Sequence, residues 1–256
     1  MIRPSSLAWL LWAIWVTLPA GVRAAAGQPP ASQATAPDRF SPLAQIDRSN
    51  VAHLRLKLTF RSGQRGAQGA APLVVGSTIY ILTPFPHVLF ALDLTRPAAP
   101  VKWRFAPEPD SIAAGLTCCD RLEHGPVYAK GRLYFSTLDG RVIALDAETG
   151  GVAWNVRVAD PHNGETLVSA PEVVGSELVI GNGGDEFGAR GWIMALDAAT
   201  GQQIWKHYST GPDSDVGIDP AGDDLGTTTW PAGLWQHGGG SVSAPVLYLV
   251  GRPPPL

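Results

Sequence analysis

The sequence is poor in charge, and it lacks the signatures of several common classes of protein. Only 16% of its 256 residues are charged while 45% are hydrophobic, which is enough apolar material for a core and too little charge for a disordered chain. Its 22 Asp and Glu residues outnumber 19 Lys and Arg residues, so we expect no nucleic-acid partner. The sequence contains neither a phosphate-binding loop nor a serine nucleophile motif.

Long hydrophobic runs are missing except near the N-terminus. Arg3 precedes an apolar stretch from Leu7 to Leu18, and Val22-Arg23-Ala24 has the small-x-small pattern of a cleavage site. A stretch of about a dozen residues is shorter than the roughly 20 that a membrane-spanning helix needs. We therefore expect a cleaved signal peptide at residues 1–24 rather than a membrane anchor, with no stable membrane span. The Ala/Pro/Gln-rich residues 25–39 are expected to form a flexible leader.

Cysteine is almost absent, and the two cysteines, Cys118 and Cys119, are neighbours. Export places them where disulfides persist. Adjacent Cα atoms lie about 3.8 Å apart, below the usual disulfide range of roughly 4.4–6.8 Å, so a bridge between them would strain the peptide. The residues by themselves leave two free thiols and a strained bridge as alternatives.

What the sequence does contain is turns, tryptophan and a repeat. It has 29 glycines, 23 prolines and 9 tryptophans, with little helix-period patterning. The tripeptide Ala-Leu-Asp ends at Asp93, Asp146 and Asp197, and each copy is followed by a tryptophan. The three copies are preceded by apolar segments, expected to be strands, at Ser77–Leu82, Arg132–Ser136 and Glu177–Gly181.

This repeat predicts an all-β fold made of propeller blades. A period near 50 residues is typical of one four-stranded blade. In each copy, Asp suits a turn because its carboxylate accepts backbone hydrogen bonds, and the glycine of Thr-Gly tolerates positive φ. The recurring tryptophans, Trp103, Trp154 and Trp205, are expected to pack on the next sheet and close the seam between blades.

Several stretches of residues 40–240 resemble the pyrroloquinoline-quinone (PQQ) dependent, or quinoprotein, alcohol dehydrogenases of the methanol and ethanol dehydrogenase type. The stretches that carry the resemblance are FSPLAQIDRSNVAHLRLKLTF, the segment from Ala71 to Leu94 with its Thr-Pro-Phe-Pro turn, LTCCDRLEHGPVYAKG, and VIGNGGDEFGARGWIMALDAATG. The Cys-Cys-Asp run and the Gly-Gly-x-Glu-Phe-Gly run are specific, whereas the repeat also marks non-catalytic propellers. The resemblance implies an eight-bladed propeller, of which residues 40–242 would supply an incomplete set of roughly four blades.

The resemblance also implies a cofactor site. In the family a vicinal disulfide covers one face of PQQ, which assigns Cys118 and Cys119 to that role. Glu186 matches the glutamate that binds Ca²⁺, or a lanthanide in some relatives, as a hard oxygen ligand. The residues before it, Gly183, Gly184 and Asp185, match a backbone cradle around PQQ. The implied reaction oxidises a small alcohol in the periplasm and passes electrons to a cytochrome c.

The sequence departs from the family pattern at several cofactor positions. His124 stands where the family has an arginine that pairs with PQQ carboxylates, and it lacks the bidentate guanidinium. Val168 stands where a threonine is expected, although Thr166 is close by, and Gln68 lies where a glutamate is missing. After Gly240, Ser243 occupies the position of a tryptophan that forms the floor under PQQ.

The departures leave three readings of function. Residues 243–256 no longer resemble the family, which indicates either a shifted reading frame or a diverged short protein. The family's ligand asparagine and general-base aspartate fall outside the matched residues, so we expect no turnover from this chain alone. The alternatives to a dehydrogenase portion are a non-catalytic repeat propeller that acts as a binding scaffold and a degenerate quinoprotein without cofactor.

Overall fold

The computed structural model describes residues 44–66, 68–116, 125–217, 231–237 and 240–241. Its strands are β1 (Leu73–Val75), β2 (Thr78–Leu82), β3 (Leu89–Asp93), β4 (Val101–Phe105), β5 (Val127–Ala129), β6 (Arg132–Thr137), β7 (Arg141–Asp146), β8 (Val152–Arg157), β9 (Glu172–Val174), β10 (Glu177–Gly181), β11 (Trp192–Asp197) and β12 (Gln203–Tyr208). The helix α1 (Asp213–Val216) is a single turn. The 3₁₀ turns are η2 (Val51–His53), η3 (Ser111–Ala113), η4 (Pro161–Asn163), η5 (Asp185–Phe187) and η6 (Pro231–Gln236).

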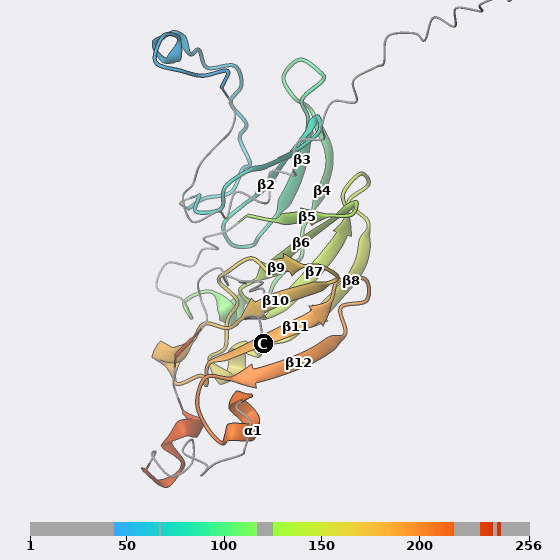
Figure 1. The fold of residues 1–256 in the computed structure, drawn as a ribbon. Coiled ribbons are helices and arrows are strands. Elements are labelled where there is room, and N and C mark those ends of the chain that lie inside the picture. Colours follow the sequence, from blue (N-terminus) through green and yellow to red (C-terminus); the bar gives the residue numbers. More distant parts are fainter. Residues whose placement is uncertain (1–43, 67, 117–124, 218–230, 238–239, 242–256) are drawn as a thin grey trace, which may run out of the picture.

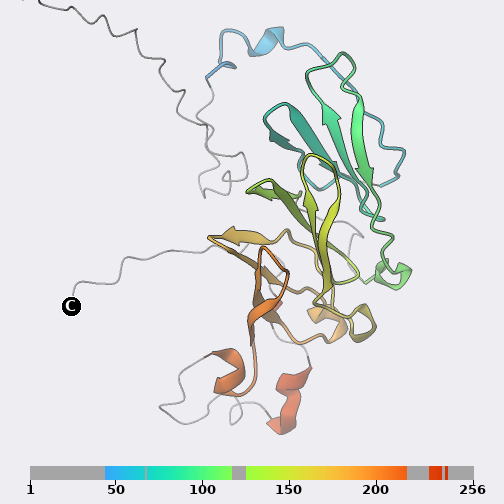
Figure 2. The same cartoon turned by 90° about the vertical axis from the view of Figure 1, so that its right-hand side faces the viewer.

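The strands form three antiparallel sheets of four, each built from consecutive strands: β1 to β4, β5 to β8 and β9 to β12. Figure 1 shows the three sheets one below another, and the view of Figure 2 shows them fanned relative to each other. The predicted incomplete β-propeller is therefore confirmed, with three complete blades in the described residues where we expected roughly four.

The blades repeat one another in register as well as in sequence. Each third strand ends with Ala-Leu-Asp, and a register shift falls between its Ala and Leu in every blade. The alanine lies opposite the recurring tryptophan of the fourth strand: Ala91 opposite Trp103, Ala144 opposite Trp154 and Ala195 opposite Trp205. The predicted strands agree with β2, β6 and β10 to within one residue at either end.

The turn after each Ala-Leu-Asp is held by its aspartate. Asp146 Oδ1 accepts hydrogen bonds from the Thr149 amide and hydroxyl, both at 2.8 Å, and Asp197 does the same with Thr200. The threonine hydroxyl, followed by the backbone amide, lowers the pKa of each aspartate below its ordinary value. Local hydrogen bonding therefore explains why this sequence pattern marks a turn.

Two of the three recurring tryptophans, Trp103 and Trp154, close seams between the described blades, as expected. The Trp103 indole Nε1 donates to the Ala147 carbonyl of the second blade at 3.1 Å, and Trp154 donates to Ala198 of the third blade at the same distance. The rings lie so close to Gly150 and Gly201 that a Cβ there would come within 2.7 Å and 2.8 Å of an indole carbon. Each seam thus needs a tryptophan on one side and a glycine on the other.

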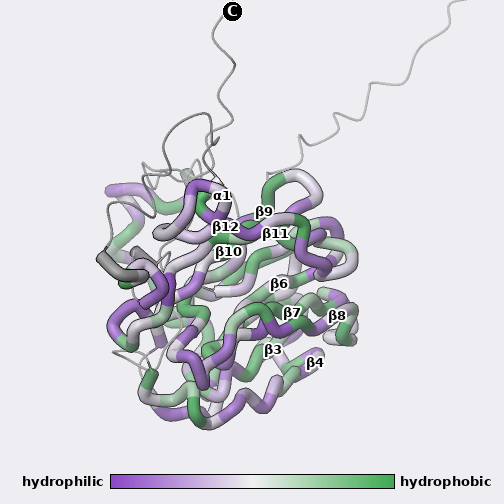
Figure 3. The backbone as a smooth tube through the Cα atoms, turned by 90° about the horizontal axis from the view of Figure 1, so that it is seen from below, coloured by the Kyte–Doolittle hydropathy of each residue, from purple (hydrophilic) through white to green (hydrophobic). Residues whose placement is uncertain are grey.

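The core lies between the blades rather than within one sheet. One buried cluster joins the first two blades and includes Leu82, Leu89, Leu133, Phe135 and Leu145. A second joins the last two and includes Val142, Ala144, Leu178, Ile180 and Trp192. In Figure 3 the hydrophobic stretches follow the strands, and hydrophilic stretches are frequent in the connections. Within the described residues we find no helix with the length and apolarity needed to cross a membrane.

Candidate functional site

The candidate cofactor residues lie at one end of the blades. The antiparallel order places the β2–β3, β6–β7 and β10–β11 connections at the end opposite the Asp-Thr turns. The segment between β8 and β9 reaches the same end, since Thr166 and Gly183 form an isolated antiparallel bridge. The structure thus brings Thr166 together with Gly183 and Gly184, 17 or more residues further along the chain.

Thr166 and Gly183 form a small cradle with one free hydroxyl. Their backbones exchange two hydrogen bonds, of 2.8 and 3.2 Å. Thr166 is 1% exposed, and its Oγ1 has no hydrogen-bond partner among the residues that the structure describes. A Cβ on Gly183 would lie 3.1 Å from that Oγ1 and 3.6 Å from a methyl of Val168. Because a buried hydroxyl without a partner is unfavourable, this atom is suited to bind a group from outside the described chain.

Gly184 begins the tight loop that carries the two candidate acids. Only glycine fits this position, for two reasons. Its φ is +107°, and a Cβ would lie 1.9 Å from the Gly164 carbonyl oxygen. The following turn η5 contains Asp185 and Glu186, both of which are exposed. The amides of Phe187 and Ala189 both donate to the Gly184 carbonyl, at 2.9 and 3.0 Å. We call residues 183–189 the Glu186 loop.

Glu186 is a single carboxylate in the described structure. No group of three or more His, Cys, Asp or Glu side chains within the described ranges is placed to hold a metal ion. Glu186 can therefore contribute one or both of its carboxylate oxygens. The rest of a Ca²⁺ or lanthanide coordination shell, which holds about six to eight oxygens, must come from the cofactor, water or other residues.

Three candidates fall where the chain is not described. Cys118, Cys119 and His124 lie outside the described residues, as does Ser243. The predicted vicinal disulfide and the histidine contact to PQQ therefore stay predictions.

Gln68, which stands near the missing family glutamate, has a different role in this chain. Its Nε2 donates to the Ala70 carbonyl at 2.8 Å and to the Leu82 carbonyl at 2.6 Å. The side-chain amide thus ties the start of the first blade to the end of β2. A glutamate in the same position could not donate these hydrogen bonds.

Sequence reasoning missed Asn182, which closes the base of the Glu186 loop. Asn182 is fully buried; its Oδ1 accepts from the Trp192 amide at 2.7 Å, and its Nδ2 donates to the Arg190 carbonyl at 3.0 Å. Glu165 supports the same region, because its carboxylate accepts from the Trp192 indole at 2.8 Å and from the Asp160 amide at 2.9 Å. The only signal in the sequence was a polar residue directly after the apolar β10.

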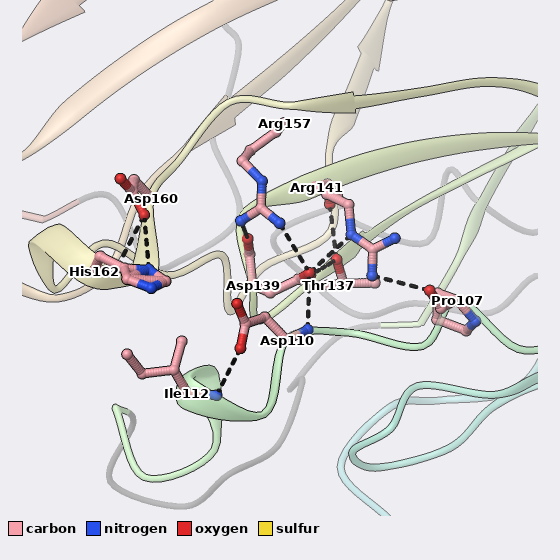
Figure 4. Close-up of polar contacts among 9 residues, drawn as sticks. All are labelled: Pro107, Asp110, Ile112, Thr137, Asp139, Arg141, Arg157, Asp160 and His162. Carbon is pink, nitrogen blue, oxygen red and sulfur yellow. Dashed lines mark hydrogen bonds and ion pairs between the residues drawn. The ribbon is translucent and has the colours of Figure 1, made fainter.

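Asp139, also missed, is the centre of a buried polar network on the β6–β7 turn (Figure 4). It is 1% exposed, and its carboxylate binds Arg141 Nε at 2.8 Å, the Asp110 amide at 3.2 Å and the Thr137 hydroxyl. Arg157 approaches the same carboxylate at 3.5 Å. Beside this network an open depression of about 650 Å³ is lined by Asp110, Arg157, Asp160, His162 and Glu165, among others.

His87 is another buried polar residue at this end. It lies in the β2–β3 connection with φ +61° and is 0% exposed, and within the described part of the chain neither ring nitrogen has a hydrogen-bond partner. Burial lowers its pKa to about 4; the nearby Asp139 charge opposes the shift and Arg141 adds to it. The imidazole is therefore neutral at physiological pH.

Comparison with known proteins gives two family matches. Residues 30–119 match the sequence profile described as glucose/ethanol/alcohol dehydrogenase, beta-propeller domain. Residues 94–222 match the profile described as outer membrane protein assembly factor BamB. The two matches together span all three blades.

Individual relatives are dehydrogenases. The chain is 41% identical over 213 residues to the lanthanide-dependent methanol dehydrogenase of Methylacidiphilum fumariolicum, and 40% identical over 221 residues to methanol dehydrogenase (cytochrome c) subunit 1 of Methylorubrum extorquens. Each match covers 80% of this chain and 35% of the relative. A europium-containing methanol dehydrogenase structure matches with a TM-score of 0.71 and 40% identity, over 76% of this chain and 35% of that one. The chain thus spans about a third of the length of these relatives.

Proposed function

Because the chain belongs to the family of PQQ-dependent (quinoprotein) alcohol dehydrogenases, we propose that its described blades form one side of a PQQ and metal site for the oxidation of small alcohols. The observation that carries the proposal is the cradle at Thr166 and Gly183, with its free buried hydroxyl next to the Glu186 loop. The residues present fit the group, since a flat cofactor needs close backbone approach and a hydrogen-bonding contact at its edge.

The chain's own residues have separable roles in this proposal. When bound, PQQ and its metal supply an electrophilic quinone carbonyl that accepts hydride from the alcohol. Glu186 supplies a carboxylate oxygen to Ca²⁺ or a lanthanide, and the Thr166 hydroxyl hydrogen-bonds a polar edge of the cofactor. Gly183 and Gly184 let the backbone approach it, and Asp185 adds a second negative charge close to Glu186.

The remaining expectations extend the same proposal. Cys118 and Cys119 form a vicinal disulfide over one face of the cofactor, and His124 donates a hydrogen bond to a PQQ carboxylate, with a weaker hold than arginine would give. Residues 1–24 direct export to the periplasm, where a cytochrome c accepts the electrons. None of the described residues is assigned as the base that removes the alcohol's proton, so the decisive test is binding rather than turnover.

The test is a titration of the purified chain with PQQ in the presence of Ca²⁺ or La³⁺. We expect retained quinone absorbance after gel filtration, at about one PQQ per chain. Glu186→Gln removes the metal-ligand charge and should weaken metal-dependent retention at least about tenfold. Thr166→Val, which keeps the shape but removes the free hydroxyl, should weaken retention by about three- to tenfold with either metal.

The matched control is Glu177→Gln, because Glu177 lies at the other end of β10, opposite Asp197. It removes the same charge from the same blade and should leave retention unchanged. Absence of any metal-dependent retention would contradict the proposal and favour a propeller without cofactor, the second reading, which is consistent with the assembly-factor match over residues 94–222. Equal loss in Glu177→Gln and Glu186→Gln would also contradict the assignment of Glu186.

A further inference from the structure

Arg190 lies immediately after the Glu186 loop, and its side chain is held by a different part of the chain. The guanidinium carbon lies 3.8 Å from the ring centroid of Tyr208 and 4.6 Å from that of Trp235. Its Nη2 pairs with Asp215 at 2.9 Å, and its Nε donates to the Thr210 carbonyl at 2.9 Å. We call residues 209–217 with 231–237 the downstream segment.

The downstream segment is fitted to this guanidinium. Gly211 has φ +116°, and a Cβ there would lie 2.1 Å from Arg190 Nη2 and 2.9 Å from the Trp235 ring. The Thr210 hydroxyl also donates to the Trp235 carbonyl at 3.0 Å, which holds η6 against the end of β12. The Arg190 side chain is 15% exposed and that of Asp215 is 36% exposed, so the guanidinium is largely shielded from solvent, and its stacking on two aromatic rings adds to a partly exposed ion pair.

Arg190 is equally well connected to the Glu186 loop. Its carbonyl accepts the Asn182 side-chain amide, which spans the base of the loop, and its neighbour Ala189 donates to Gly184 at 3.0 Å. A displacement of the Arg190 backbone would therefore strain both the closing hydrogen bond and the short turn η5. The other restraints on the loop are backbone hydrogen bonds, namely the Thr166–Gly183 bridge at its start and the turn bonds of η5, while residues 185–188 are exposed.

We propose that Arg190 is a positioning residue that couples the Glu186 loop to the downstream segment. The Glu186 carboxylate then keeps one orientation only while Tyr208, Trp235 and Asp215 hold the guanidinium. The consequence for metal binding rests on the proposed function; the coupling does not.

The coupling is tested by hydrogen exchange at the amides of Phe187, Gly188 and Ala189 in the full chain. Trp235→Leu lies in η6, outside the three sheets, and removes one stacking partner without touching the loop. We expect it to speed exchange at these amides about tenfold, and Arg190→Met to do the same. The double variant should show no faster exchange than either single variant, because both substitutions break the same connection.

Conservative and distant variants separate positioning from general destabilisation. Arg190→Lys keeps the charge but loses the planar guanidinium that stacks on the rings. Its loop amides should therefore be better protected from exchange than those of Arg190→Met, but less well than those of wild type. Glu148→Gln breaks the Lys102–Glu148 pair, also 2.9 Å long, at the seam of the first two blades, and should leave the loop unchanged. The coupling would be overturned if Trp235→Leu left the exchange rates of these amides within about twofold of wild type. It would also be overturned if Glu148→Gln accelerated exchange as much as Trp235→Leu does.

A second measurement follows Tb³⁺ luminescence during titration of the same proteins. We expect Trp235→Leu to weaken Tb³⁺ binding at least about threefold while its sheets remain folded. Failure of wild-type protein to bind Tb³⁺ in a Glu186-dependent manner would count against the proposed function, and the exchange result would still decide the coupling. Unchanged Tb³⁺ affinity in Trp235→Leu, with wild-type binding intact, would overturn the positioning role.

Discussion

At the residue scale, the burial of His87 makes the stability of the chain depend on pH. Its pKa is about 4 in the folded chain because burial disfavours the charged ring, against about 6.5 for an unfolded histidine. The unfolded chain therefore binds a proton at a higher pH than the folded chain. The contribution of His87 to stability is complete above pH 6.5 and is lost as the pH falls from 6.5 toward 4.

We predict that His87→Asn flattens this part of the stability profile. Asn tolerates the positive φ of 61° and does not titrate. Wild type should lose up to about 3 kcal/mol between pH 6.5 and 4 from this residue, and the variant should not. The measurement is the free energy of unfolding in urea at several pH values. Parallel profiles for the two proteins would show that His87 is not the titrating group.

At the element scale, the β6–β7 turn depends on one buried carboxylate. Asp139 joins the turn to the start of η3 through the Asp110 amide and to β8 through Arg157, whose Nη1 donates to the Asp139 carbonyl at 2.6 Å. Gly140, with φ +84°, has no room for a side chain, since a Cβ would lie 2.0 Å from the Ala159 carbonyl. The turn therefore organises three segments at the end of the blades where the candidate site lies.

We predict that Asp139→Ala destabilises the chain by about 3–5 kcal/mol, because it leaves the Arg141 guanidinium, whose side chain is only 15% exposed, without its counter-charge. The matched control is Asp160→Ala in the neighbouring connection. Asp160 is half exposed and accepts the His162 amide as the cap of η4, so its loss should amount to about 1 kcal/mol. Urea unfolding measures the free energy of unfolding of both variants. Similar losses of stability in the two variants would contradict the central role of Asp139.

At the scale of the whole molecule, stability depends on the seams between blades. Gly201 meets the Trp154 ring of the preceding blade, whereas Gly175, with a similar positive φ of 64°, has no heavy atom near its Cβ position. A substitution at either position strains the backbone alike, and only the first disturbs a seam.

We predict that Gly201→Val destabilises the chain by about 1–3 kcal/mol more than Gly175→Val, because the valine displaces Trp154 from its place against the third blade. Urea unfolding monitored by tryptophan fluorescence measures both the free energy and the environment of the indole. Equal losses of unfolding free energy in Gly201→Val and Gly175→Val would show that the seam tolerates displacement of the Trp154 ring.

Much of the fold could be predicted because it arises from local chemistry that repeats. The Asp146–Thr149 turn and its counterpart at Asp197 are made within four residues, so their sequence pattern is visible without tertiary structure. The apolar strands before them follow from periodicity in the same way. The positions of Gly184 and Glu186 followed from resemblance to a family, which carries tertiary information that a single sequence does not.

The sequence by itself therefore determined the strands, the turns and the positions of the seam tryptophans, since each lies in a short repeated motif. The contact of each seam tryptophan with a glycine of the next blade was visible only in the structure. Only the tertiary structure decided which polar residues matter around the site. Asn182, Asp139, Arg190 and His87 stand in no periodic pattern, and their roles come from burial and from partners often far along the chain. Burial strengthens such contacts by excluding water, and it depends on how the blades pack rather than on neighbouring residues.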